Sequence, residues 1–124
     1  MANATALHID GREAGLRVQV ASTWIARAVG LLATPRLDDP AGLWIVPCSS
    51  VHTCWMRYAI DVVFVDDAGI VLRVVPKLKP WRMAGCRRAR ATLELRAGLA
   101  QELGIAPGVA LGMPASGRPG RKAR

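Results

Sequence analysis

The chain has 124 residues, which is a usual length for one domain with one hydrophobic core. Hydrophobic residues make up 52% of it and charged residues 21%, and this composition excludes a wholly disordered chain. No apolar run reaches the ~18 residues that a membrane-spanning helix requires, while the net charge of +8 suggests a polyanionic partner such as nucleic acid.

Two segments carry most of this charge. Arg73–Arg90 holds seven cationic side chains and no acid, and Pro114–Arg124 holds four and no acid. The latter has no large apolar residue, so we expect a disordered basic tail at residues 114–124 after a single β-rich domain at residues 1–113. The two segments carry charges of +7 and +4, so the rest of the chain must have a net charge of −3 to give the total of +8. A nucleic-acid partner would therefore have to contact these two segments.

The first third of the chain predicts a strand followed by a helix. Apolar and polar residues alternate over Leu16–Ala21, as in a half-buried strand. We expect a short helix near residues 23–34, because Ser22 or Thr23 can cap it, an apolar face follows, and Pro35 ends it.

From Gly42 onward the pattern changes to short strands. The clearest feature is a β-hairpin over Ile60–Val75, whose two apolar runs are joined by the turn sequence Asp66–Gly69. The prolines and the glycine within Arg73–Arg90 make that segment loop-like. Strands at such short spacing predict a mainly β, single-domain fold of the sandwich or barrel-like type. The other predicted elements are a helical turn near residues 98–103 and strands at Leu43–Val46, Ser50–Trp55, Ala91–Arg96 and Val109–Leu111.

Three cysteines do not make a disulfide framework, and the N-terminus lacks the basic and apolar regions of a secretory signal. We therefore expect free thiols and a cytoplasmic protein. The sequence contains no Gly-rich nucleotide-binding loop and no metalloprotease motif, so we expect no cofactor.

Several motifs, taken in order, are similar to those of one bacterial and archaeal family. They are Arg27–Leu31 (RAVGL), Trp55–Arg57 (WMR), Ile60–Gly69 (IDVVFVDDAG), Pro80-Trp81 and Leu93–Gly98 (LELRAG). Together they resemble the domain of unknown function 192 family, over about Trp24 to Leu111. The resemblance implies a small, mainly β, sandwich-like domain, and it implies no enzyme mechanism. Two positions depart from the family pattern, because Cys54 stands where Phe is common and Val109 stands where an acid is common.

Four residues carry side chains that zinc prefers: Cys48, His52, Cys54 and Cys86. If Ser50–Trp55 is a strand, His52 and Cys54 face the same side, because side chains alternate along a strand. Their spacing matches no common zinc motif, and buried free cysteines are frequent in protein cores. We therefore predict no metal site, and these four residues are the candidates if one exists.

His52, Asp61 and Glu94 are the candidates for acid–base catalysis. Asp61 interrupts an apolar strand, so it is expected to point inward and to need a partner, which could be His52, Arg57 or Arg82. Such a pair would suit a hydrolase-like enzyme acting on a small molecule. We favour a structural ion pair or hydrogen bond that fixes the loop at residues 50–58, because no recognisable nucleophile accompanies these residues.

Trp55, Met56, Arg57, Trp81 and Arg82 predict a ligand-binding groove. Each Trp stands next to an Arg or one residue from it, and an indole beside a guanidinium suits a ligand with an anionic and an apolar part. The main hypothesis is therefore a non-enzymatic binding module for a small anionic ligand, a peptide or a partner protein. The enzyme is the alternative, and nucleic-acid association through Arg73–Arg90 and the tail is the third hypothesis.

Overall fold

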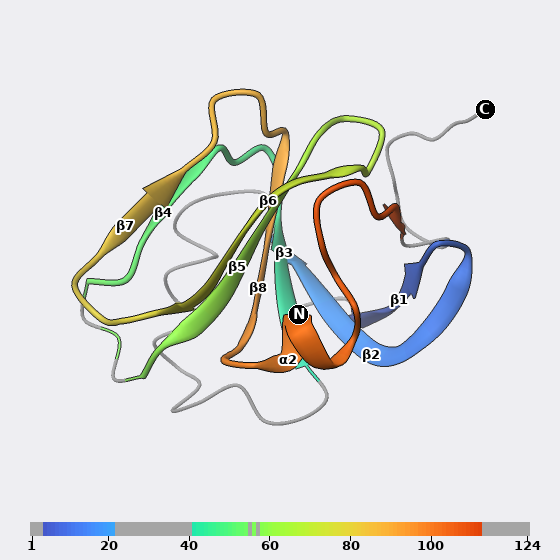
Figure 1. Cartoon of the computed structure of the whole chain (residues 1–124), viewed down its shortest axis with the longest axis horizontal. Coiled ribbons are helices and arrows are strands. Elements are labelled where there is room, and N and C mark those ends of the chain that lie inside the picture. The colour runs from blue at the N-terminus through green and yellow to red at the C-terminus, as the bar shows by residue number, and fades with distance from the viewer. Residues whose placement is uncertain (1–3, 22–40, 55, 57, 113–124) are drawn as a thin grey trace.

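The computed structural model describes residues 4–21, 41–54, 56 and 58–112 (Figure 1). Its main feature is a mixed sheet of seven strands in the order β6-β5-β8-β3-β2-β1-β9. Neighbouring strands are antiparallel, except that β2 and β3 are parallel. The strands are β1 (Ala4–Ile9), β2 (Arg12–Ala21), β3 (Ala41–Ile45), β5 (Ile60–Val65), β6 (Val71–Leu78), β8 (Ala91–Arg96) and β9 (Leu111–Gly112).

The mainly β fold class is confirmed, and the large sheet is open rather than closed into a barrel. Its two edge strands, β6 and β9, approach each other at one corner, where Ile70 and Ala110 form an isolated bridge. Next to this bridge the Leu111 N–H donates to the carbonyl of Gly69 at 2.8 Å. Gly69 has a φ of 86°, and a side chain there would collide with the Leu111 carbonyl, so glycine is required.

Side chains alternate across the large sheet, and both of its faces contribute to the core. One face, which includes Val63 and Leu93, packs against Leu99 of the short helix α2 (Leu99–Glu102). The opposite face carries Phe64, which packs with Val51 of β4 (Ser50–His52). Strand β5 is buried along its whole length, because it lies between β6 and β8 and both of its faces are covered.

The predicted hairpin over Ile60–Val75 corresponds to β5 and β6, and the predicted strand Ala91–Arg96 is β8 with the same bounds. The helical turn near residues 98–103 is α2. The predicted helix near residues 23–34 and the predicted tail at residues 114–124 lie outside the described residues. In the part that is described, no helix has the length and apolar character needed to cross a membrane.

The N-terminal hairpin of β1 and β2 is missing from the sequence-based prediction. Its turn consists of Asp10 and Gly11, with φ values of 51° and 85°. Positive φ at both positions is typical of the tight turn that an Asp-Gly pair forms between two strands. The sequence therefore contained the Asp-Gly pair that indicates this hairpin, a few residues before the predicted strand Leu16–Ala21.

Strands β4 and β7 (Met83–Gly85) form a separate two-stranded antiparallel sheet, which we call the β4–β7 ribbon. In Figure 1 it lies on one side of β5, and the β1–β2 hairpin lies on the other. The prediction that the basic segment is loop-like beyond the hairpin is corrected by β7 and by the length of β6. Strand β6 continues through Pro76. Proline has no backbone N–H to donate, and an edge strand tolerates this because the groups on its outer side pair with no neighbouring strand. The chain then turns back to form β7.

Candidate functional site

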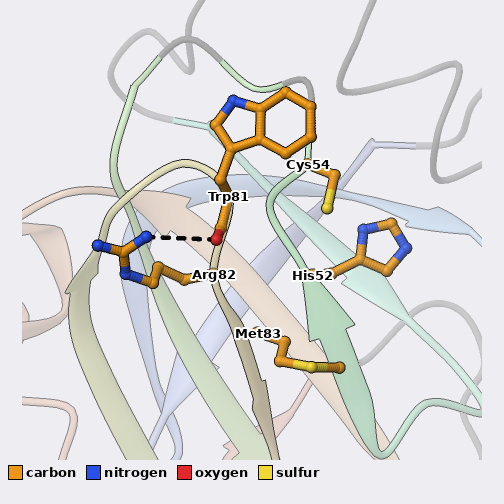
Figure 2. A pocket seen from close by; sticks show the side chains of 5 residues that line it. All are labelled: His52, Cys54, Trp81, Arg82 and Met83. Carbon is orange, nitrogen blue, oxygen red and sulfur yellow. Dashed lines mark hydrogen bonds between the residues drawn. The ribbon is translucent and has the colours of Figure 1, made fainter.

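A concavity of about 520 Å³ opens at the end of the β4–β7 ribbon, where β4 ends and β7 begins. We call it the ribbon concavity, and Figure 2 shows the residues that line it: His52, Cys54, Trp81, Arg82 and Met83. His52 and Met83 are paired across the ribbon. Cys54 lies two residues beyond His52, and Figure 2 shows both side chains on the same side of the chain segment that carries Trp81.

Thr53 holds the loop that shapes this concavity. Its side chain is completely buried, and its hydroxyl donates to the carbonyl of Lys79 at 2.6 Å and accepts from the N–H of Arg82 at 2.9 Å. Its backbone N–H donates to the carbonyl of Arg82, and its carbonyl accepts from the N–H of Trp81 at 3.1 Å. Because these bonds join one residue to Lys79, Trp81 and Arg82, they fix the conformation of the loop.

Trp81 has an unusual backbone and an unusual exposure. Its φ is 65°, a conformation that costs a residue other than glycine about 1 kcal/mol or more. Its side chain is 54% exposed, and that of Met83 is 73% exposed. These are the exposed large hydrophobic residues found in the described part of the chain, and both line the ribbon concavity. Strained backbone and exposed apolar surface are both typical of binding sites.

The surroundings of the concavity are basic. Exposed Lys77 and Lys79 precede Trp81, and Arg82 follows it, whereas Arg73–Arg90 contains no acid. The Arg82 guanidinium donates to the Trp81 carbonyl at 3.4 Å, and Figure 2 shows it pointing away from His52. Arg73 is used structurally, since its Nη1 donates to the carbonyl of Gly85 at 2.6 Å. The remaining cations favour a negatively charged ligand.

Asp61 is buried, with 1% of its surface exposed, and it lies within β5. Its Oδ1 accepts from the N–H of Lys77 at 2.9 Å, and its Oδ2 accepts from the N–H groups of Gly98 and Ala100 at 3.0 and 2.9 Å. The carboxylate thus joins β6 to the N-terminus of α2, where free N–H groups favour negative charge. These bonds make Asp61 a structural residue, although they do not involve the loop at residues 50–58 that we expected.

His52 and the two candidate acids occupy different parts of the fold. His52 is exposed on β4 and lines the ribbon concavity, whereas Glu94 is buried on β8 between Leu43 of β3 and Val62 of β5. Neither Glu94 nor Asp61 belongs to the lining of that concavity. The arrangement therefore does not bring an acid to His52 from these two positions.

The four candidate metal ligands divide into two pairs. Cys48 and Cys86 are half-buried cysteines outside any disulfide, and they lie beyond Ser49 and Gly85, at the end of the ribbon opposite the concavity. The thiol of Cys48 donates to the carbonyl of Ser50 at 3.2 Å. His52 and Cys54 lie at the other end. Across the described ranges, no three His, Cys, Asp or Glu residues are close enough to hold a metal ion.

The predicted groove is only partly represented by the described residues. Trp81 and Arg82 line the ribbon concavity, whereas Met56 is half-buried and packs against the cluster around Phe64. Trp55 and Arg57 lie outside the described residues. Sequence reasoning missed Thr53 and Met83, and the only signal for Met83 was its position two residues after Trp81.

The comparisons with known proteins give a family and a fold. The model of the DUF192 family, described as "Uncharacterized ACR, COG1430", matches residues 5–113. A "UPF0127 protein" of Thermococcus sibiricus is 34% identical over an alignment of 71 residues, and the match covers 53% of this chain and 45% of that protein. The match therefore spans less than half of the relative's length.

Two solved structures share the fold at low sequence identity. A protein of unknown function from Novosphingobium aromaticivorans has a TM-score of 0.76 and 23% identity, over 88% of this chain and 84% of its own. A protein from Sinorhizobium meliloti, described as a "putative transcription regulator", has a TM-score of 0.79 and 20% identity, over 90% of this chain and 95% of its own. These likenesses extend to the fold alone.

Proposed function

We propose that this chain, which belongs to the DUF192 family, is a non-enzymatic binding module that takes an acidic segment of a partner protein in the ribbon concavity. One observation carries the proposal: Trp81 and Met83, the large apolar side chains exposed in the described residues, line the same concavity beside a basic segment. Trp and Arg are the residues that most often dominate binding energy at protein interfaces.

The shape of the concavity favours a peptide segment over a small molecule. Pockets for small ligands bury most of the ligand surface, whereas this concavity opens beside the exposed side chains of His52, Trp81 and Met83. An extended segment could cover Trp81 and Met83 together and place an acidic side chain near Lys79 or Arg82. Because Thr53 holds the loop in place, little conformational entropy would be lost on binding.

The test is a selection from a peptide display library on the wild-type protein, with counter-selection against Trp81→Ala. We expect enriched sequences that combine an acidic with an aromatic or aliphatic residue, and about tenfold or greater loss of affinity in Trp81→Ala, which corresponds to about 1.4 kcal/mol. Arg12→Ala is the matched control, because Arg12 is an exposed cation of β2 outside the ribbon.

Two outcomes would contradict the proposal. One is a set of enriched peptides that bind Trp81→Ala as tightly as the wild type. The other is binding of a DNA duplex that is tighter than any peptide and equal in both proteins, because that result would assign the basic segment to nucleic acid.

A further inference from the structure

The ribbon concavity also collects three potential metal ligands, of which only His52 and Cys54 were candidates from the sequence. His52 supplies an imidazole, Cys54 a thiol and Met83 a thioether, and all three line the concavity. His52 and Met83 are opposite each other across the ribbon, so their β-carbons are neighbours. Figure 2 shows Cys54 on the same side as His52. The pairing of His52 with Met83 and the position of Cys54 therefore place one nitrogen and two sulfur donors around the same concavity.

The chemistry of this set selects among metals. Thiolate and thioether sulfur favour soft ions, Cu(I) above all, whereas Mg²⁺ and Ca²⁺ require oxygen ligands. The lining described for the concavity includes no carboxylate. A structural zinc site usually has four ligands from Cys and His, while these three residues include only one of each. The donor set thus matches Cu(I) better than it matches the common divalent ions.

The basic surroundings oppose every cation, but they do not oppose all cations equally. Lys79 and Arg82 lie in the loop at the concavity, and they repel a divalent cation more strongly than a monovalent one. One thiolate neutralises one Cu(I), so the occupied site would add no net charge to a basic region. The exposure of Met83, at 73%, leaves its sulfur free to turn toward an ion.

We propose that His52, Cys54 and Met83 bind a single Cu(I) ion in the ribbon concavity. The inference goes beyond the proposed function and does not depend on it. Binding releases the thiol proton of Cys54 to solvent as the sulfur–copper bond forms. The imidazole and the thioether coordinate as neutral ligands. The metal enters as Cu(I) and stays so, and no electron is transferred.

The test titrates Cu(I) alone, without oxygen, against a chromogenic Cu(I) chelator. The background is the variant Cys48→Ser/Cys86→Ala, since these two thiols at the far end of the ribbon would otherwise add their own affinity for copper. We expect one Cu(I) per chain in this background. X-ray absorption at the copper edge should show scattering from both sulfur and nitrogen neighbours.

Substitutions of the ligands separate this site from adventitious binding to a thiol. His52→Ala, Cys54→Ser and Met83→Leu should each weaken Cu(I) binding by about tenfold or more. Met83→Leu is the sharpest variant, because it removes the sulfur and keeps an apolar side chain of similar size. All three residues are at least partly exposed, so these variants should fold.

The proposal is overturned if the background variant does not compete with the chelator, or if His52→Ala and Met83→Leu bind Cu(I) as tightly as it does. Tighter binding of Zn²⁺ than of Cu(I) would also overturn it. The copper titration contains no peptide and the peptide selection contains no copper, so either proposal can fail without the other.

Discussion

Buried polar residues have different roles in the large sheet and at the β4–β7 ribbon. In the large sheet, polar side chains such as Asp61 are buried and bonded to backbone groups, so their chemistry is used to hold the fold. At the end of the ribbon, directly after β4, the buried polar residue is Thr53, and its bonds hold the loop that carries the exposed Trp81. The large sheet thus supplies stability, and the ribbon presents reactive and apolar groups to solvent.

The contrast separates side chains that hold the fold from side chains that remain available for binding. A buried acid in an apolar strand attracts attention in the sequence, yet three backbone N–H groups account for Asp61. The exposure and the positive φ of Trp81, in contrast, carry no signal in the sequence. Substitutions in the two regions should therefore have effects of different size and kind.

The largest expected effect is that of Asp61→Ala. It would leave three buried or half-buried N–H groups without their acceptor, so we expect a loss of about 3–5 kcal/mol in the free energy of unfolding, measured with urea. The matched control is Asp66→Ala, which removes a carboxylate that accepts from Ala68 and Ile70 in a more exposed turn. Its expected cost is about 1 kcal/mol, and equal costs would refute the structural role of Asp61.

The next effect concerns the corner of the large sheet. Gly69→Ala should cost about 2–4 kcal/mol, because it adds a collision with the Leu111 carbonyl to the strain of a positive φ. Gly108→Ala is the control, since Gly108 has a φ of 95° and open space around it. Thermal unfolding of both variants separates the effect of the collision from that of the positive φ. Equal unfolding midpoints would show that the backbone at Leu111 moves aside without loss of stability.

The smallest effect on stability is expected at two buried threonines, Thr53 at the end of the ribbon and Thr92 in the large sheet. Thr53→Val and Thr92→Val each remove a buried hydroxyl, and each should cost about 1–2 kcal/mol. Only Thr53→Val should accelerate hydrogen exchange at the amides of Trp81 and Arg82, because its hydroxyl holds their loop. Faster exchange at these amides in Thr92→Val as well would mean that the ribbon is not an independent unit.

Much of the large sheet could be predicted because its strands are long enough to show a pattern. The apolar runs of β5 and β6 and the turn between them identified their hairpin, and β8 was found with its exact bounds. The burial of Asp61 could be expected from its apolar neighbours. The hydrogen-bond partners of Asp61 could not be predicted, because the backbone N–H groups of Lys77, Gly98 and Ala100 carry no signal in the sequence.

The ribbon was predicted only in part, because the strand expected at Ser50–Trp55 contains β4, whereas β7 was not expected. A strand of three residues such as β7 shows no periodicity, and its pairing with β4 joins segments about thirty residues apart. Trp81 and Arg82 were identified as candidates from their residue types alone. The position of Trp81 is set by Thr53. The hydroxyl of Thr53 bonds to Lys79 and Arg82, which lie 26 and 29 residues farther along the chain.

The pairing of β9 with β1 has a consequence for how the chain is made. His8 pairs with Gly112, and the N–H of Ala110 donates to the Asp10 side chain across 100 residues. During synthesis the outer edge of β1 therefore stays open until nearly all of this sheet has left the ribosome. Contacts of such long range slow folding, and an open strand edge invites pairing with other chains.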